Sequence, residues 1–166
     1  MKLISGVALA LLAGLLAPAK ANAQEPSSAV VGVWKVLSVE TKEVTSGKVA
    51  KPFGDQPTGT FFFSQRGRMA GMQFGTNRKA AAAPNATEAE RAALFASMSA
   101  YSGTYKVVGK KLIFNIENSS IQSWNGTERA INIEINGAKL TGTSDPFKSL
   151  ISGLDVVAVV TWEKVE

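Results

Sequence analysis

Apolar and polar residues alternate with a period of two along most of the chain, which is the pattern of a β-strand with one buried face. Eight segments have this pattern, and most of them are joined by short turns that contain glycine, proline or asparagine. They are residues 32–44, 58–64, 68–74, 104–108, 111–117, 127–135, 138–143 and 154–164. Among the turns, Asn136-Gly137 is the strongest hairpin signal. The pattern predicts an all-β, mainly antiparallel fold.

Eight antiparallel strands in succession predict a closed barrel. Closure removes the two edge strands, which would otherwise be free to pair with other chains. We expect Trp34 and Trp162, near the two ends of the strand series, to be core residues that close the barrel. The interior of an eight-stranded barrel is either filled by side chains or holds one small ligand.

One segment has the period of a helix instead of a strand. Thr87 and Glu90 form a capping box, which predicts a helix that begins just after Thr87. An apolar stripe at helical spacing follows, at Leu94, Phe95, Met98 and Tyr101. We therefore expect one inserted α-helix around residues 87–101, with its stripe buried against the strands and Arg91 exposed. A role as a lid is the alternative.

The first 23 residues have the features of a secretory signal peptide. Lys2 gives a positive start, residues 3–17 are apolar, and the small residues Ala21 and Ala23 fit a cleavage site. The run is shorter than the about 20 apolar residues of a membrane span, although a retained anchor is the alternative. We expect cleavage after Ala23 and a periplasmic or secreted protein. The domains are then a signal peptide at 1–23, a short polar lead at 24–31 and the barrel at 32–166.

The composition excludes several kinds of site. A chain of 166 residues with 45% hydrophobic residues suits one domain with its own core. It has no cysteine and no histidine, which excludes disulfides and thiolate metal sites and removes the commonest general base. Without Lys2 and Lys20, the 18 basic side chains fall to 16, against 13 acidic ones. Because the basic residues are scattered, we expect no nucleic-acid partner, and we expect no cofactor.

A series of short motifs resembles the bacterial lipocalin-like domain family. In chain order they are Gly32-Val33-Trp34, Pro52-Phe53-Gly54, Gly67-Arg68-Met69, Tyr101, Gly103-Thr104-Tyr105, Glu117, Ser119, Trp124, Gly126, Arg129 and Trp162-Glu163. Each motif is weak alone, but together they span nearly all of the mature chain in the order of the family. The resemblance implies a lipocalin-like barrel and, by analogy, a small apolar ligand, although a fold does not fix a function. Relatives often carry a His-His pair where this chain has Phe114 and Asn115, so histidine-dependent chemistry is not expected here.

The stretch from Phe114 to Ile135 decides whether the barrel has a site. Asn115, Glu117 and Ser119 share one face of their strand, and an outer face in contact with water would explain them without any site. That face has no lysine, however, and Arg129 begins the isoleucine face of the next strand. An inward arginine needs a partner, so we expect Glu117 and Arg129 to point into the barrel and interact. A one-residue shift in register would reverse this outcome.

Three functions remain open from the sequence. The first is an exported, non-catalytic lipocalin-like barrel that binds a small, largely apolar molecule. The second is an isomerase or cyclase in which Glu117 or a tyrosine moves a proton. The third is an envelope interaction protein with a filled barrel.

For the first function we expect the ligand-binding residues to be Phe62, Met69, Tyr101, Tyr105, Asn115, Glu117, Ser119, Trp124 and Arg129. No residue is assigned to catalysis or to metal binding. The expected partner is a small apolar molecule, without nucleic acid and without stable membrane insertion after signal cleavage.

Overall fold

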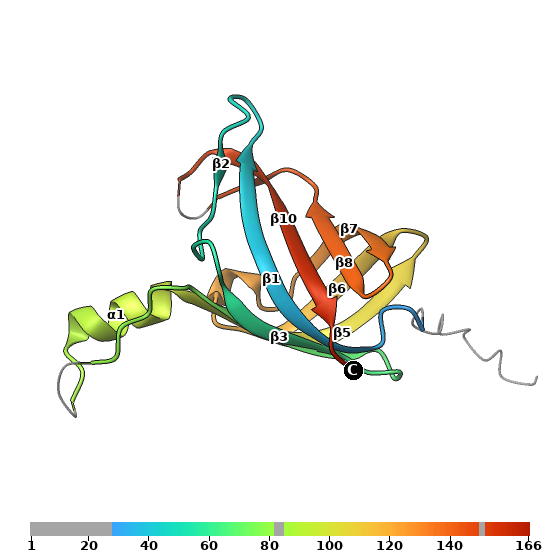
Figure 1. Ribbon diagram of the computed structural model, residues 1–166, viewed down its shortest axis with the longest axis horizontal. Coiled ribbons are helices and arrows are strands. Elements are labelled where there is room, and N and C mark those ends of the chain that lie inside the picture. Colours follow the sequence, from blue (N-terminus) through green and yellow to red (C-terminus); the bar gives the residue numbers. More distant parts are fainter. Residues whose placement is uncertain (1–27, 82–84, 150–151) are drawn as a thin grey trace, which may run out of the picture.

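The computed structural model describes residues 28–81, 85–149 and 152–166, and most of these residues lie in β-strands (Figure 1). In chain order the elements are β1 (Gly32–Glu43), β2 (Val49–Ala50), β3 (Thr58–Phe63), β4 (Arg68–Phe74), α1 (Glu88–Ala96), β5 (Met98–Val108), β6 (Lys111–Ser119), the 3₁₀-helix η1 (Gln122–Trp124), β7 (Glu128–Asn136), β8 (Lys139–Ser144), β9 (Phe147–Lys148) and β10 (Asp155–Lys164). The expected signal peptide, residues 1–23, lies outside the described residues.

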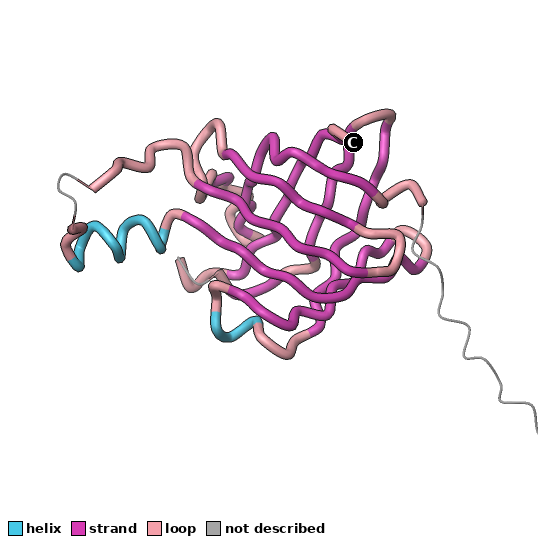
Figure 2. Tube along the Cα trace, turned by 90° about the horizontal axis from the view of Figure 1, so that it is seen from below, coloured by secondary structure: helices cyan, strands magenta, loops and turns pink. Residues whose placement is uncertain are grey.

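Eight of the strands close into an antiparallel barrel, as the sequence pattern predicts. Each strand from β3 to β8 pairs with its neighbours, and the ring is completed because β10 pairs with both β8 and β1. The β1–β10 ladder is long and runs from Trp34↔Lys164 to Glu43↔Val156. The short strands β2 and β9 extend the sheet at one end of this ladder. Figure 2 shows the strands crossing one another around the barrel.

Tight turns set the register of the hairpins. The β7–β8 loop consists of Gly137 and Ala138, because Asn136 still pairs with Lys139. Gly137 has a φ of +59°, a conformation that costs glycine little and most other residues more. The expected hairpin is therefore confirmed, with its turn one residue further along the chain.

Apolar side chains fill one end of the barrel, which we call the packed end. Trp34 and Trp162 lie in this core as expected, and the Trp34 indole donates a 2.8 Å hydrogen bond to the Val30 carbonyl. The core cluster consists of Val30, Trp34, Val36, Val39, Phe61, Phe63, Met69, Tyr105, Val107, Leu112, Phe114, Ile116, Ile133, Leu140 and Trp162. Burial of these side chains supplies the main driving force for closure, because the chain has no disulfides.

The helix is shorter than expected and does not cover the barrel. Its capping box forms as predicted, with the Thr87 hydroxyl accepting from the Glu90 amide and the Glu90 carboxylate accepting from the Thr87 amide. It ends at Ala96, however, because Met98 already pairs with β4, and a second ladder joins β5 to β6 from residue 101. Backbone pairing thus overrides the helical spacing.

The apolar stripe of the helix is consequently not a packing face, and that expectation was wrong. No residue of α1 is buried, and the Phe95 side chain is 59% exposed. The ribbon and the tube views both show α1 projecting away from the strands (Figures 1 and 2). Arg91 is exposed as expected, and Arg78 fixes the end of the helix by donating to the Leu94 carbonyl at 2.9 Å and the Ser97 hydroxyl at 3.0 Å.

Candidate functional site

The inward-facing residues change in character toward the end of the barrel opposite the packed end. Directly opposed residues of antiparallel strands share a face, so the inward direction can be followed around the barrel from Trp34 through each ladder. At this second end, the open end, the inward positions include Thr41, Ser99, Tyr101, Ser119, Arg129, Ser144, Val156 and Ala158. Ser99 and Val156 are buried, and the others are partly exposed although they point inward. Solvent therefore reaches the interior from this end.

A continuous group of aromatic rings connects the packed end to the open end. Phe61 packs edge-on against Trp162, with ring centroids 5.5 Å apart, and against Tyr101 at 5.6 Å. Tyr101 in turn contacts Phe114 at 6.3 Å and Trp124 at 5.7 Å. Edge-to-face contacts of this kind are favourable beyond simple burial. The rings give the open end a rigid apolar wall.

Trp124 reaches this wall from the connection between β6 and β7. Trp124 is the last residue of the 3₁₀-helix η1, and two hydrogen bonds tie this connection back to Ile116. The Ile116 amide donates to the Thr127 carbonyl at 2.9 Å, and the Ile116 carbonyl accepts from the Gly126 amide at 2.8 Å. Gly126 has a φ of +74°, which permits the return of the chain. The indole is half-buried beside the core cluster.

Arg129 is the charged residue of the open end. Because it opposes the buried Phe114 in the β6–β7 ladder, its side chain starts on the inner face, as expected. Its guanidinium lies over the Trp124 ring, with the Cζ atom 4.0 Å from the ring centroid. Its Nε atom is buried and has no hydrogen-bond partner among the described residues. Burial lowers the pKa of Arg129 from its ordinary value, which the neighbouring Tyr101 partly offsets, and the group remains a cation.

The expected Glu117–Arg129 pair does not form, and that prediction was wrong. The Glu117 carboxylate instead accepts two hydrogen bonds from Arg68, at 2.7 Å from Nη1 and 2.8 Å from Nη2. Both side chains are largely exposed, and the hydrogen bonds from Arg68 lower the pKa of Glu117. A bidentate pair of this geometry leaves the carboxylate no role inside the barrel.

A β-bulge explains this arrangement. In the β5–β6 ladder Ser102 pairs with Asn118 and Gly103 with Ile116, so Glu117 is the extra residue. The bulge changes the phase of the strand, and Ser119 consequently opposes the inward-facing Tyr101. Glu117 and Ser119, which strict alternation places on one face, lie on opposite faces.

The structure divides the residues expected to bind ligand into three groups. Tyr101, Ser119, Trp124 and Arg129 come together at the open end. Met69 and Tyr105 are buried at the packed end, where the Tyr105 hydroxyl donates to the Ser64 carbonyl at 2.8 Å. Phe62, Asn115 and Glu117 are exposed on the outside of the barrel.

Sequence reasoning missed the other side of the open end. Ser144 and Ala158 are inward by register, and a hydrogen bond from the Ala158 amide to the Ser144 hydroxyl, 2.9 Å long, joins them. The sequence did contain a signal for this side: Ala158 is a small residue in phase with the larger Val160 and Trp162 on the same strand. Small residues at inward positions leave space that a larger residue would fill.

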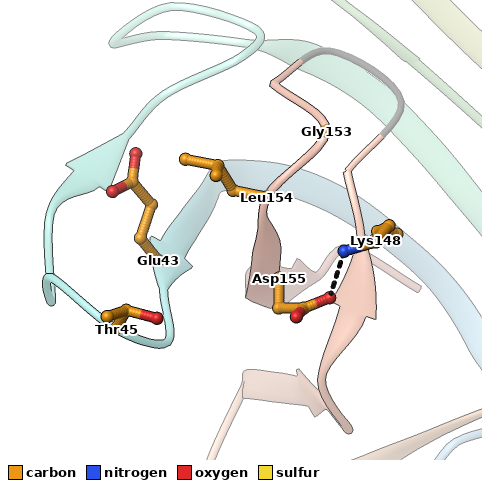
Figure 3. Close-up of a pocket in the computed structure, with 6 residues that line it drawn as sticks. All are labelled: Glu43, Thr45, Lys148, Gly153, Leu154 and Asp155. Atoms are coloured by element: carbon orange, nitrogen blue, oxygen red, sulfur yellow. Dashed lines mark hydrogen bonds and ion pairs between the residues drawn. The ribbon is translucent and has the colours of Figure 1, made fainter.

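Two surface cavities are described. The larger one, of about 300 Å³, lies between the start of β7 and the segment after β8 and is lined by Thr127, Glu128, Arg129, Ala130, Ser144, Asp145, Pro146 and Phe147. The smaller one, of about 130 Å³, is shown in Figure 3 and is lined by Glu43, Thr45, Lys148, Gly153, Leu154 and Asp155. Its main polar contact is the exposed 3.3 Å ion pair of Lys148 and Asp155. Of these two cavities, only the larger includes residues of the open end, namely Arg129 and Ser144.

A comparison with protein families identifies the fold. The sequence model of the lipocalin-like domain matches residues 31–165. The chain belongs to the lipocalin-like domain family. No curated protein matches this lipocalin-like chain. A solved structure of an uncharacterized protein from Bacteroides eggerthii is similar, with 16% sequence identity, coverage of 81% of this chain and 98% of that chain, and a TM-score of 0.39.

The described part of this lipocalin-like chain offers no metal site and no membrane-spanning helix. Within it, no three acidic side chains come together in a way that would hold a metal ion. Its helices are too short and too polar to cross a bilayer.

Proposed function

We propose that the protein binds a small, largely apolar molecule at the open end of its lipocalin-like barrel. The observation that carries the proposal is the contrast between the two ends. Most side chains that point inward at the packed end are buried, whereas most of those at the open end remain partly exposed although they point inward. A concave, mostly apolar surface with a few polar groups is the usual form of a small-molecule site.

The chemistry of the open end favours an apolar body for the ligand. Tyr101 and Trp124 form an aromatic wall, and Ser144 and Ala158 provide short side chains across from it. Aromatic rings supply large contact areas with few rotatable bonds, so their affinity is gained at a small cost in conformational entropy.

Proton-transfer catalysis receives no support from the same residues. Glu117, the strongest acid expected from the sequence, is paired with Arg68 on the outer face. Burial raises the pKa of Tyr101, so its hydroxyl stays protonated and is a donor instead of a base. A binding function therefore fits the open end better than an isomerase or cyclase.

The proposal also includes export of the protein. The support is the signal-like sequence of residues 1–23, which precedes the family match that begins at residue 31. We propose a periplasmic or secreted location, where the barrel would carry or hold its ligand outside the cytoplasm.

Binding can be tested with a neutral apolar fluorophore, N-phenyl-1-naphthylamine, and two matched variants. Ala158→Phe places a large ring on the inner face of β10, and we expect it to weaken binding by about tenfold or more, because the ring occupies the ligand space. Val157→Phe adds a similar bulk to the outer face one residue earlier, and binding should be unchanged.

Circular dichroism would confirm that both variants fold, and native mass spectrometry of protein from its own host would look for a bound molecule. Equal binding by the two variants would place the fluorophore elsewhere. If the wild type neither binds the fluorophore nor carries a small molecule, the filled barrel with an interaction role is the better description.

A further inference from the structure

Arg129 has no negatively charged partner in the described part of the chain. None of the ion pairs there includes it, and its buried Nε finds no acceptor. A buried N–H without an acceptor is unfavourable, and native proteins seldom leave one without a reason. Among the described residues, the favourable contact of the Arg129 charge is with the Trp124 ring, which attracts the cation but carries no opposite charge.

The guanidinium N–H groups lie in the plane of the group, so a ring placed over its face does not use them. The Nε atom of this edge is buried, which leaves the terminal Nη groups as the donors for a ligand. A carboxylate matches this edge, because its two oxygens accept two parallel hydrogen bonds from the fork. The Tyr101 hydroxyl, close enough for the charge of Arg129 to act on it, offers a further donor.

The acidic residues around the cavity do not serve this role. Glu128 and Asp145 line the same cavity as Arg129, but each has a lysine partner. Glu128 lies 3.9 Å from the Lys106 ammonium, and Asp145 lies 3.2 Å from that of Lys111. The lysines compensate the two carboxylates at the rim, so an incoming anion meets little net repulsion.

We infer that the ligand is an amphipathic organic acid, whose carboxylate binds the Arg129 guanidinium while its apolar body lies against Tyr101 and Trp124. The inference rests on the proposed function and adds the chemical class of the ligand. The open end then binds a medium-length acid with its head group at the β7 side and its tail toward the aromatic wall. A neutral apolar molecule would leave the Arg129 charge without a counter-ion.

The test compares decanoate with decanol, which have the same chain length and differ in charge. Both would displace N-phenyl-1-naphthylamine from the folded full-length domain at neutral pH. We expect decanoate to bind at least about tenfold more tightly, as for one charge-assisted pair of hydrogen bonds. Arg129→Gln should remove this preference, so that decanoate and decanol bind with similar affinity, and Arg129→Lys should keep only part of it, because lysine lacks the planar fork. Arg66→Gln, in the exposed β3–β4 turn, controls for the loss of one positive charge.

Each outcome separates the inference from the function beneath it. Equal affinity of the wild type for the two probes would overturn the organic-acid assignment and leave the apolar site standing. A preference for decanoate that survives in Arg129→Gln, or that is lost equally in Arg66→Gln, would overturn the role of Arg129. If neither probe binds, the proposed function itself fails.

Discussion

Replacement of Arg129 by methionine tests the structural basis of the site without any ligand. The substitution removes a cation–π contact at 4.0 Å, worth about 1–2 kcal/mol for a partly desolvated group. It also removes a buried Nε without an acceptor, whose presence costs about 1–3 kcal/mol. Methionine keeps an apolar contact with the indole, worth about 0.3–1.5 kcal/mol. Together these contributions predict a change in the free energy of unfolding between a loss of about 0.7 and a gain of about 3.5 kcal/mol.

Urea unfolding followed by circular dichroism would measure this change, because tryptophan fluorescence is itself altered by the loss of the Trp124 contact. The slope of the free energy against urea should be unchanged, which would show that only stability differs. Arg66→Met, in an exposed turn, is the control for loss of a charge. A destabilisation of about 3 kcal/mol or more by Arg129→Met would refute the reasoning, since losses of that size follow from breaking a buried ion pair.

Four further predictions follow from the fold and the sequence. Phe95→Ala should change the free energy of unfolding by less than about 0.5 kcal/mol, because the Phe95 side chain is exposed and no described residue of α1 is buried; a larger loss in urea unfolding would contradict its exposure. A double-mutant cycle of Glu117→Gln and Arg68→Gln should be non-additive at low salt and nearly additive in about 1 M salt. Burial raises the pKa of Tyr105 from 10.0 to about 12, so its contribution to stability should be constant between neutral pH and 10 and fall as the pH rises from 10 to 12, and Tyr105→Phe should reduce the alkaline fall in urea midpoints. Export should yield a mature chain that starts at Gln24, and N-terminal sequencing of exported protein that still carries the signal would disprove it.

The barrel was predictable because its strands are encoded locally. Period-two alternation identified the eight closing strands, and turn residues identified the hairpins, since both signals act within a few residues. The inward direction of Arg129 followed from its phase with Ile131 and Ile133 on the same strand. These features need no knowledge of which strand lies beside which.

The bulge and the end of the helix were not predictable in the same way. Whether Glu117 is an extra residue depends on how β6 pairs with β5, which alternation within β6 does not encode. Met98 and Tyr101 fit a helical stripe equally well, but two neighbouring strands satisfy their backbone groups in a sheet. Both errors arose where long-range pairing decided between two locally acceptable structures.

The way α1 leaves and rejoins the barrel has a consequence for protein engineering. The chain departs after β4 and returns to β5 at adjoining positions, where the Gly75 amide donates to the Ser97 carbonyl at 2.8 Å. The described residues from 77 to 81 and from 85 to 96 form an arm with a narrow base, because the ladder of β4 and β5 is complete without them. Such an arm is a suitable point at which to attach a label, an affinity tag or a second domain, although its base adjoins the open end, because Ser97 lies two residues before the inward-facing Ser99. Variation in this arm between relatives would alter the outline of the molecule and leave the barrel unchanged.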